Sequence, residues 1–144
     1  AYGIALLAIG RTAAFKRCAA IASGLILATL GAGVVADAVR RALVGGEPDG
    51  WIMALTAVVS LIVNASVLKM LAPYRKGEVH LRAAWIFTRA DVIANLGVIS
   101  AAVLVLATTS RVPDLLVGAA IGLYVLKESS EILREARQTK GAES

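Results

Sequence analysis

Three long stretches without a charged residue constrain the fold of this chain more than any other feature of its sequence. They cover residues 18–36, 51–68 and 92–110 and contain 19, 18 and 19 residues. About 20 apolar residues in an α-helix cross the hydrocarbon core of a bilayer, and about 17–25 are tolerated. Apolar residues make up 58% of the 144-residue chain, against roughly 45–50% in soluble domains. The composition excludes a disordered chain and predicts an integral membrane protein.

The hydrophobic pattern predicts an all-α, polytopic membrane helix bundle with four transmembrane helices. We expect these spans at about 18–38, 51–71, 82–109 and 112–130. Residues 1–10 form a further apolar segment that is too short to span, and we expect it to be the end of a fifth helix. Short turns rich in glycine, proline and charged residues separate the spans. We therefore expect residues 1–144 to form a single transmembrane domain without a soluble domain.

Basic residues are distributed unevenly between the two ends of the predicted bundle. Segments 11–17, 69–82 and 127–140 carry eleven of the fifteen lysines and arginines, whereas 37–50 and Arg111 carry three. Basic residues collect on the cytoplasmic side of membrane proteins. The distribution therefore predicts a cytoplasmic C-terminus in a membrane that we expect to be the bacterial inner membrane. This topology explains the net charge of +5, so we expect no nucleic-acid partner.

Asp91 is the only carboxylate near the centre of a predicted span. It lies about nine residues, or roughly 14 Å of helix, inside the third span. An ionisable group at that depth costs at least about 2.5–3.5 kcal/mol and normally marks an ion or proton path. Phe87, Asp91 and Asn95 share one helix face, and Arg89 points away from it. We predict that Asp91 and Asn95 bind a metal cation; alternatively, Arg89 and Asp91 form a structural pair or bind other helices.

Other polar and small residues are predicted to have structural roles. Asn64 in the second span is expected to hydrogen-bond across helices, or alternatively to line a site. Gly118 and Gly122 form a G-x-x-x-G motif that permits close helix packing. His80 precedes the third span, and we expect it to be solvated. Cys18 is the single cysteine, which excludes an intramolecular disulfide.

Enzyme motifs are absent from the sequence. It contains no glycine-rich phosphate loop, no G-x-S-x-G and no H-E-x-x-H. We therefore expect that the protein is not an enzyme and holds no resident cofactor.

Residues 77–105, GEVHLRAAWIFTRADVIANLGVISAAVLV, resemble the fifth transmembrane helix of cation diffusion facilitators, which export divalent metals in exchange for protons. The lead-in at 80–84 and the Gly-Val-Ile stretch at 97–99 carry the likeness, and 113–118 resembles the start of the family's sixth helix. The resemblance covers nearly the whole chain. It implies that the four spans are helices three to six and that residues 1–10 end helix two.

The resemblance also implies a cation site. Family members hold the ion at mid-membrane with two ligands from helix two and two from helix five. Asp91 matches one ligand of helix five, whereas Phe87 occupies the position of the family's histidine and cannot bind metal. The helix-two ligands would precede residue 1. A site made of Asp91, Asn95 and such carboxylates is rich in oxygen and would suit Mn²⁺ or Mg²⁺ better than Zn²⁺.

The expected function is therefore that of a membrane transporter resembling divalent-cation/proton exporters, with the lipid bilayer and a divalent cation as partners. A homodimer or a larger membrane complex is also expected. Two alternatives stay open. One is a small proton-coupled exporter, although such proteins carry their essential carboxylate in the first span. The other is a non-transporting scaffold or accessory subunit that packs through Gly118 and Gly122.

Overall fold

A computed structural model describes residues 2–45 and 50–138 of the chain, and regular structure in these residues is helical. The elements are α1 (Tyr2–Leu7), α2 (Ala13–Val44), α3 (Gly50–Leu71), a short 3₁₀ helix (Ala72–Tyr74), α4 (Val79–Thr108) and α5 (Val112–Gln138). The predicted all-α class is confirmed. Four of the six residues in the predicted 45–50 turn lie outside the described ranges.

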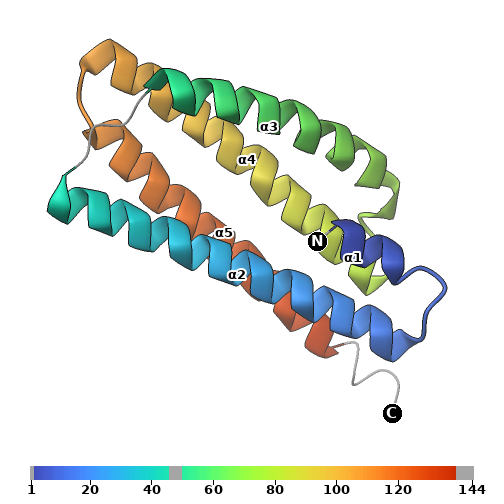
Figure 1. Ribbon diagram of the computed structural model, residues 1–144. Helices are drawn as coiled ribbons and strands as arrows, with labels where there is room; N and C mark the ends of the chain where they lie inside the picture. The colour runs from blue at the N-terminus through green and yellow to red at the C-terminus, as the bar shows by residue number, and fades with distance from the viewer. Residues whose placement is uncertain (1, 46–49, 139–144) are drawn as a thin grey trace.

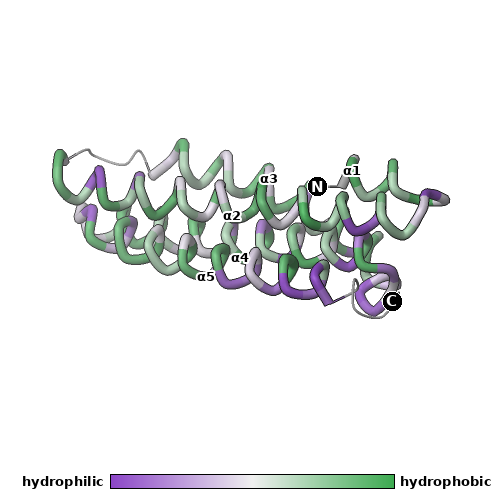
Figure 2. Tube along the Cα trace, turned by 90° about the horizontal axis from the view of Figure 1, so that it is seen from below, coloured by the Kyte–Doolittle hydropathy of each residue, from purple (hydrophilic) through white to green (hydrophobic). Residues whose placement is uncertain are grey.

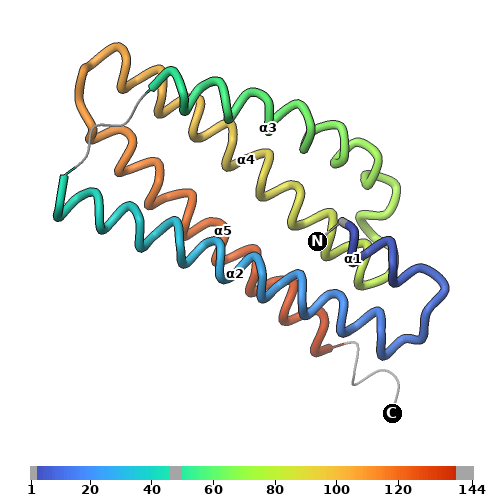
Figure 3. The backbone as a smooth tube through the Cα atoms, viewed as in Figure 1, coloured from blue at the N-terminus to red at the C-terminus, as the bar shows by residue number. Residues whose placement is uncertain are grey.

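The long helices are arranged as two antiparallel pairs (Figures 1 and 3). Helix α2 packs along α5, and α3 packs along α4, with the most extensive contacts inside these two pairs. Helix α4 also contacts α5 and α2, and it thereby joins the α2/α5 pair to the α3/α4 pair. The short helix α1 lies against α4 at the end where the α3–α4 connection and the end of α5 also lie.

Three helices of the described residues are long and apolar enough to cross a membrane: α2, α3 with the 3₁₀ turn that follows it, and α4. Helix α5 is not among them. Its 27 residues are sufficient in length, but Asp114 near its start and Lys127, Glu128 and Glu131 in its second half shorten its uncharged stretch. A polytopic helical bundle is thus confirmed, and the count of four spans stays a prediction.

The helices extend beyond the predicted spans. Helix α2 begins five residues before the predicted start, because the Thr12 hydroxyl caps it by accepting a hydrogen bond from the Phe15 amide at 3.4 Å. Helix α5 continues to Gln138. Its final turns are not a purely solvated extension, because Ile132 and Ala136 are fully buried.

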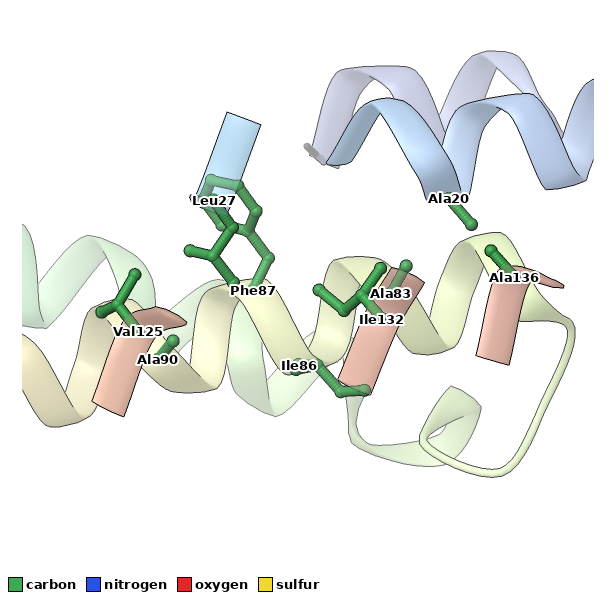
Figure 4. Packing of buried hydrophobic residues seen from close by; sticks show 9 residues of the cluster. All are labelled: Ala20, Leu27, Ala83, Ile86, Phe87, Ala90, Val125, Ile132 and Ala136. Atoms are coloured by element: carbon green, nitrogen blue, oxygen red, sulfur yellow. The ribbon is translucent and has the colours of Figure 1, made fainter. Parts of the chain in front are cut away.

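Four of the nine buried residues in the core between α2, α4 and α5 are alanines (Figure 4). Ala20, Ala83, Ala90 and Ala136 allow the helices to approach closely, while larger groups such as Phe87 fill the remaining space. The outward face of α3 exposes large apolar side chains along its length, including Trp51, Leu55, Val59 and Ile62. Hydrophilic residues gather instead at the end near α1 and the end of α5 (Figure 2). We call this the basic end.

Candidate functional site

Asp91 is the thirteenth of the 30 residues of α4, about 18 Å along the helix from its start. Its side chain is half-buried, as is that of Asn95 one turn further along the same face. Phe87, one turn before Asp91, is buried in the core close to Leu27 of α2. The helix thus places Asp91 just beyond the tightly packed part of the bundle.

Arg89 is bound to a residue that the sequence did not single out. Its guanidinium donates a hydrogen bond to the Glu128 carboxylate of α5 and lies 4.8 Å from the ring centre of Trp85. The suggested Arg89–Asp91 pair is therefore wrong, and the alternative of a partner on another helix is correct for Arg89. The signal in the sequence was the spacing of Glu128 and Glu135, which puts two carboxylates on one face of α5.

Of the polar residues predicted to bind a cation or line a site, Asp91 and Asn95 lie one turn apart on α4. Asn64 is half-buried on α3, and no hydrogen bond within residues 2–45 and 50–138 joins it to either of them. The same residues contain no group of three or more histidine, cysteine, aspartate or glutamate side chains that would hold a metal ion. The described part of the chain therefore contributes at most part of a coordination shell.

A cavity of about 630 Å³ lies between α2, α4 and α5 in the half of the bundle away from the basic end. Ala94, Val98 and Ala101 form its α4 wall, and Met53 of α3 also borders it. Ala94 follows Asp91 by less than one helical turn. The inner end of the cavity is thus within one turn of the candidate site.

The end of this cavity that lies farthest from Asp91 carries charged groups. Arg41 of α2 bridges two carboxylates: its Nε lies 2.9 Å from Asp37 Oδ2, and its Nη1 donates a hydrogen bond to Asp114 of α5. Asp114 is 5% exposed, and Asp37 also pairs with the exposed Arg40 at 2.7 Å. The cavity is therefore lined mainly by apolar residues and has an ionic rim at this end.

His80 is buried, and the prediction of a solvated loop histidine is wrong. It lies in the first turn of α4, which begins at Val79, and it is 1% exposed because α1 and α2 cover this end of the helix. Its Nδ1 lies 3.7 Å from Glu78 Oε2. Glu78 in turn accepts a hydrogen bond from Lys16 of α2 at 2.5 Å.

Of the two glycines of α5, Gly122 lies closer to α2 than Gly118 does. A Cβ atom at this position would lie 2.5 Å from Val35 Cγ2 and 3.3 Å from the Gly31 carbonyl oxygen. A Cβ at Gly118 would meet Arg41 and Ala38 only at 3.7 and 3.8 Å. The partner of the G-x-x-x-G motif in this structure is therefore α2 of the same chain.

Comparison with known proteins agrees with this architecture. Residues 13–139 match the cation efflux transmembrane domain, and the match includes α2 to α5. No curated protein shows significant similarity to the chain. Since the match covers most of the sequence, this chain belongs to the cation efflux family, the cation diffusion facilitators, which are membrane cation transporters.

Proposed function

We propose that this protein exports a divalent cation from the cytoplasm in exchange for protons, and that Asp91 is a ligand of the transported cation. One observation carries the proposal. Of the seven acidic residues that the structure describes, six lie within ion-pair distance of a lysine or arginine and Asp91 does not. The six are Asp37, Glu78, Asp114, Glu128, Glu131 and Glu135.

The lack of an ion pair within the described residues matters for Asp91 because this residue lies in the middle of a helix that is long and apolar enough to cross a membrane. A carboxylate in the middle of a membrane-spanning helix is costly unless it is paired, protonated or facing water. The side chain is half-buried, and no lysine or arginine of residues 2–45 and 50–138 forms an ion pair with it. A bound cation would balance the negative charge of Asp91, and a proton would neutralise the carboxylate after the cation leaves. This exchange is the chemistry of a proton-coupled exporter.

The donor atoms favour a hard cation. Asp91 offers carboxylate oxygens and Asn95 offers an amide oxygen, whereas Phe87 offers none. Oxygen ligands and water suit Mn²⁺ or Mg²⁺ better than Zn²⁺, which prefers nitrogen and sulfur. We propose that water contributes further ligands to the shell. The cation is cargo, and the proposal includes no enzymatic activity and no resident cofactor.

The cavity supplies a route to this site. It extends from the ionic rim at Asp37, Arg41 and Asp114 to Ala94, close to Asp91. We propose that this rim faces the outside of the cell and that the basic end, with the end of α5, faces the cytoplasm. The distribution of lysine and arginine supports this orientation.

Cation binding by the full-length protein tests the proposal. Isothermal titration with Mn²⁺ and Zn²⁺, in two buffers of different ionisation enthalpy, measures both binding and the protons released. Asp91→Asn keeps the size and polarity of the side chain, and it should abolish pH-dependent binding. Glu131→Gln is the matched control, because it removes a 43% exposed carboxylate at the basic end, and it should bind as the wild type does.

Two outcomes would favour the other candidate functions. Equal binding by the wild type and Asp91→Asn, or no divalent binding by either, would make Asp91 structural and favour a scaffold or accessory subunit. A proton linked to Asp91 without any divalent binding would favour a small proton-coupled exporter of another substrate.

A further inference from the structure

Four ion pairs of the described residues connect the α2/α5 pair to α4, and all of them lie toward the basic end. Each joins a residue of α4, or Glu78 directly before it, to a residue of α2 or α5. They are Lys16–Glu78 at 2.5 Å, Arg82–Glu135 at 2.6 Å, Arg82–Glu131 at 3.9 Å and Arg89–Glu128. We call these four ion pairs the basic-end latch.

The other half of the bundle is connected differently. Its interhelical ion pair, Arg41–Asp114, joins α2 to α5 and thus stays inside one helix pair. Within the described residues, no ion pair links α4 to α2 or α5 in this half. The space between α2, α4 and α5 is instead the 630 Å³ cavity. The two halves therefore differ in both packing and charge.

The latch becomes more buried with depth. Glu78 at the surface is 54% exposed, Glu135 is 23% exposed and Glu128 is 4% exposed. The Arg89–Glu128 pair depends strongly on geometry, because the buried Glu128 carboxylate loses hydration that its hydrogen bond from Arg89 replaces. If α4 moved away from α5 at this end, both charges would need water. Water entry and helix separation are thus coupled at this position.

We infer that the basic-end latch holds the cytoplasmic end of the bundle closed in this structure, and that the cavity, whose wall reaches Ala94 three residues beyond Asp91, is the path to Asp91 from the opposite end. The inference rests on the proposed transport function and assigns Arg82, Arg89, Glu128 and Glu135 a role in gating. Breaking the latch should open the basic end and, because α4 is shared by both halves, should close the cavity.

The accessibility of two single cysteines to a charged, water-soluble thiol reagent tests the inference on the purified full-length protein. The background is Cys18→Ser, which removes the only native cysteine of this sequence. Ala83→Cys reports on the core at the basic end, where Ala83 is 2% exposed. Val98→Cys reports on the cavity wall.

The latch is opened with the double variant Arg89→Gln/Glu128→Gln, which leaves no lone buried charge. The labelling rate at position 83 should rise several-fold, and the rate at position 98 should fall. The variant of the less buried pair, Arg82→Gln/Glu135→Gln, should shift both rates in the same directions by less. This second variant replaces the first if the first does not fold. Arg40→Gln, which removes an exposed ion pair inside α2, should change neither rate.

A simultaneous rise at both positions would show general loosening and would overturn the inference, as would unchanged rates at both. Labelling requires no bound cation, so the experiment can be repeated with Asp91→Asn. If the labelling rates at positions 83 and 98 still change in opposite directions in the Asp91→Asn background, the latch is established even if Asp91 does not bind cations. Conversely, loss of cation binding in Asp91→Asn without these opposite changes rejects the latch and keeps the proposed function.

Discussion

The guanidinium of Arg89 on α4 donates a hydrogen bond to the nearly fully buried carboxylate of Glu128 on α5. This contact fixes the rotation of α4 two residues before Asp91. Residues two positions apart on an α-helix are about 200° apart around its axis. Asp91 is therefore directed away from the Arg89–Glu128 pair, toward a side where no arginine or lysine of the described residues pairs with its carboxylate.

Removing Glu128 alone should destabilise the protein more than removing both members of the pair. Glu128→Gln leaves the Arg89 guanidinium, which is 32% exposed, without its carboxylate partner, and it should therefore cost less than the roughly 3–5 kcal/mol that is typical of breaking a fully buried pair. The double variant Arg89→Gln/Glu128→Gln should recover most of this loss. Thermal unfolding in detergent, arranged as a double-mutant cycle, measures the coupling. Additive effects of the two substitutions would contradict a direct interaction.

Gly122 and Gly118 should differ in their tolerance of a methyl group. Gly122→Ala would place a Cβ 2.5 Å from Val35 Cγ2 and 3.1 Å from the Val35 backbone nitrogen. We expect it to lower stability by about 1–3 kcal/mol through overpacking of α2 against α5. Gly118→Ala meets only ordinary contacts and should be close to neutral. Equal melting temperatures of the two variants would show that α2 and α5 do not approach each other as described.

Topology can be tested with single cysteines in the Cys18→Ser background. Ser110→Cys lies in the α4–α5 turn and Lys76→Cys in the α3–α4 turn, at opposite ends of the bundle. We expect Ser110→Cys to react with an impermeant thiol reagent on intact cells. Lys76→Cys should react only after the membrane is permeabilised. The reverse pattern would invert the proposed orientation.

The Lys16–Glu78 ion pair should make stability depend on pH. The hydrogen bond from Lys16 holds the pKa of Glu78 below its ordinary value of 4.5. A carboxyl group whose pKa is lower in the folded state contributes stability above its unfolded pKa and loses it as pH falls through the folded pKa. Glu78→Gln should therefore be less stable than the wild type at neutral pH, and the difference should disappear in acid. Melting temperatures of the wild type and Glu78→Gln measured over a series of pH values check this prediction. A difference between the two proteins that stays constant with pH would contradict it.

The sequence by itself determined the fold class and the membrane setting. These properties are local: lipid leaves backbone groups no partner outside the chain, so a long uncharged segment becomes a helix. The distance of Asp91 from the start of its helix, about 18 Å instead of the predicted roughly 14 Å, depends on where the helix begins, and α4 begins at Val79. The family also followed from local sequence, because residues 77–105 carry its pattern within one helix.

Only the tertiary structure decided which helix faces meet. Arg89 and Glu128 are 39 residues apart, and Arg41 and Asp114 are 73 apart. Nothing in either segment records the rotation and register that bring them together. The burial of His80 similarly depends on α1 and α2 covering the first turn of α4. Helix formation is encoded in neighbouring residues, whereas these contacts arise from the simultaneous packing of several helices.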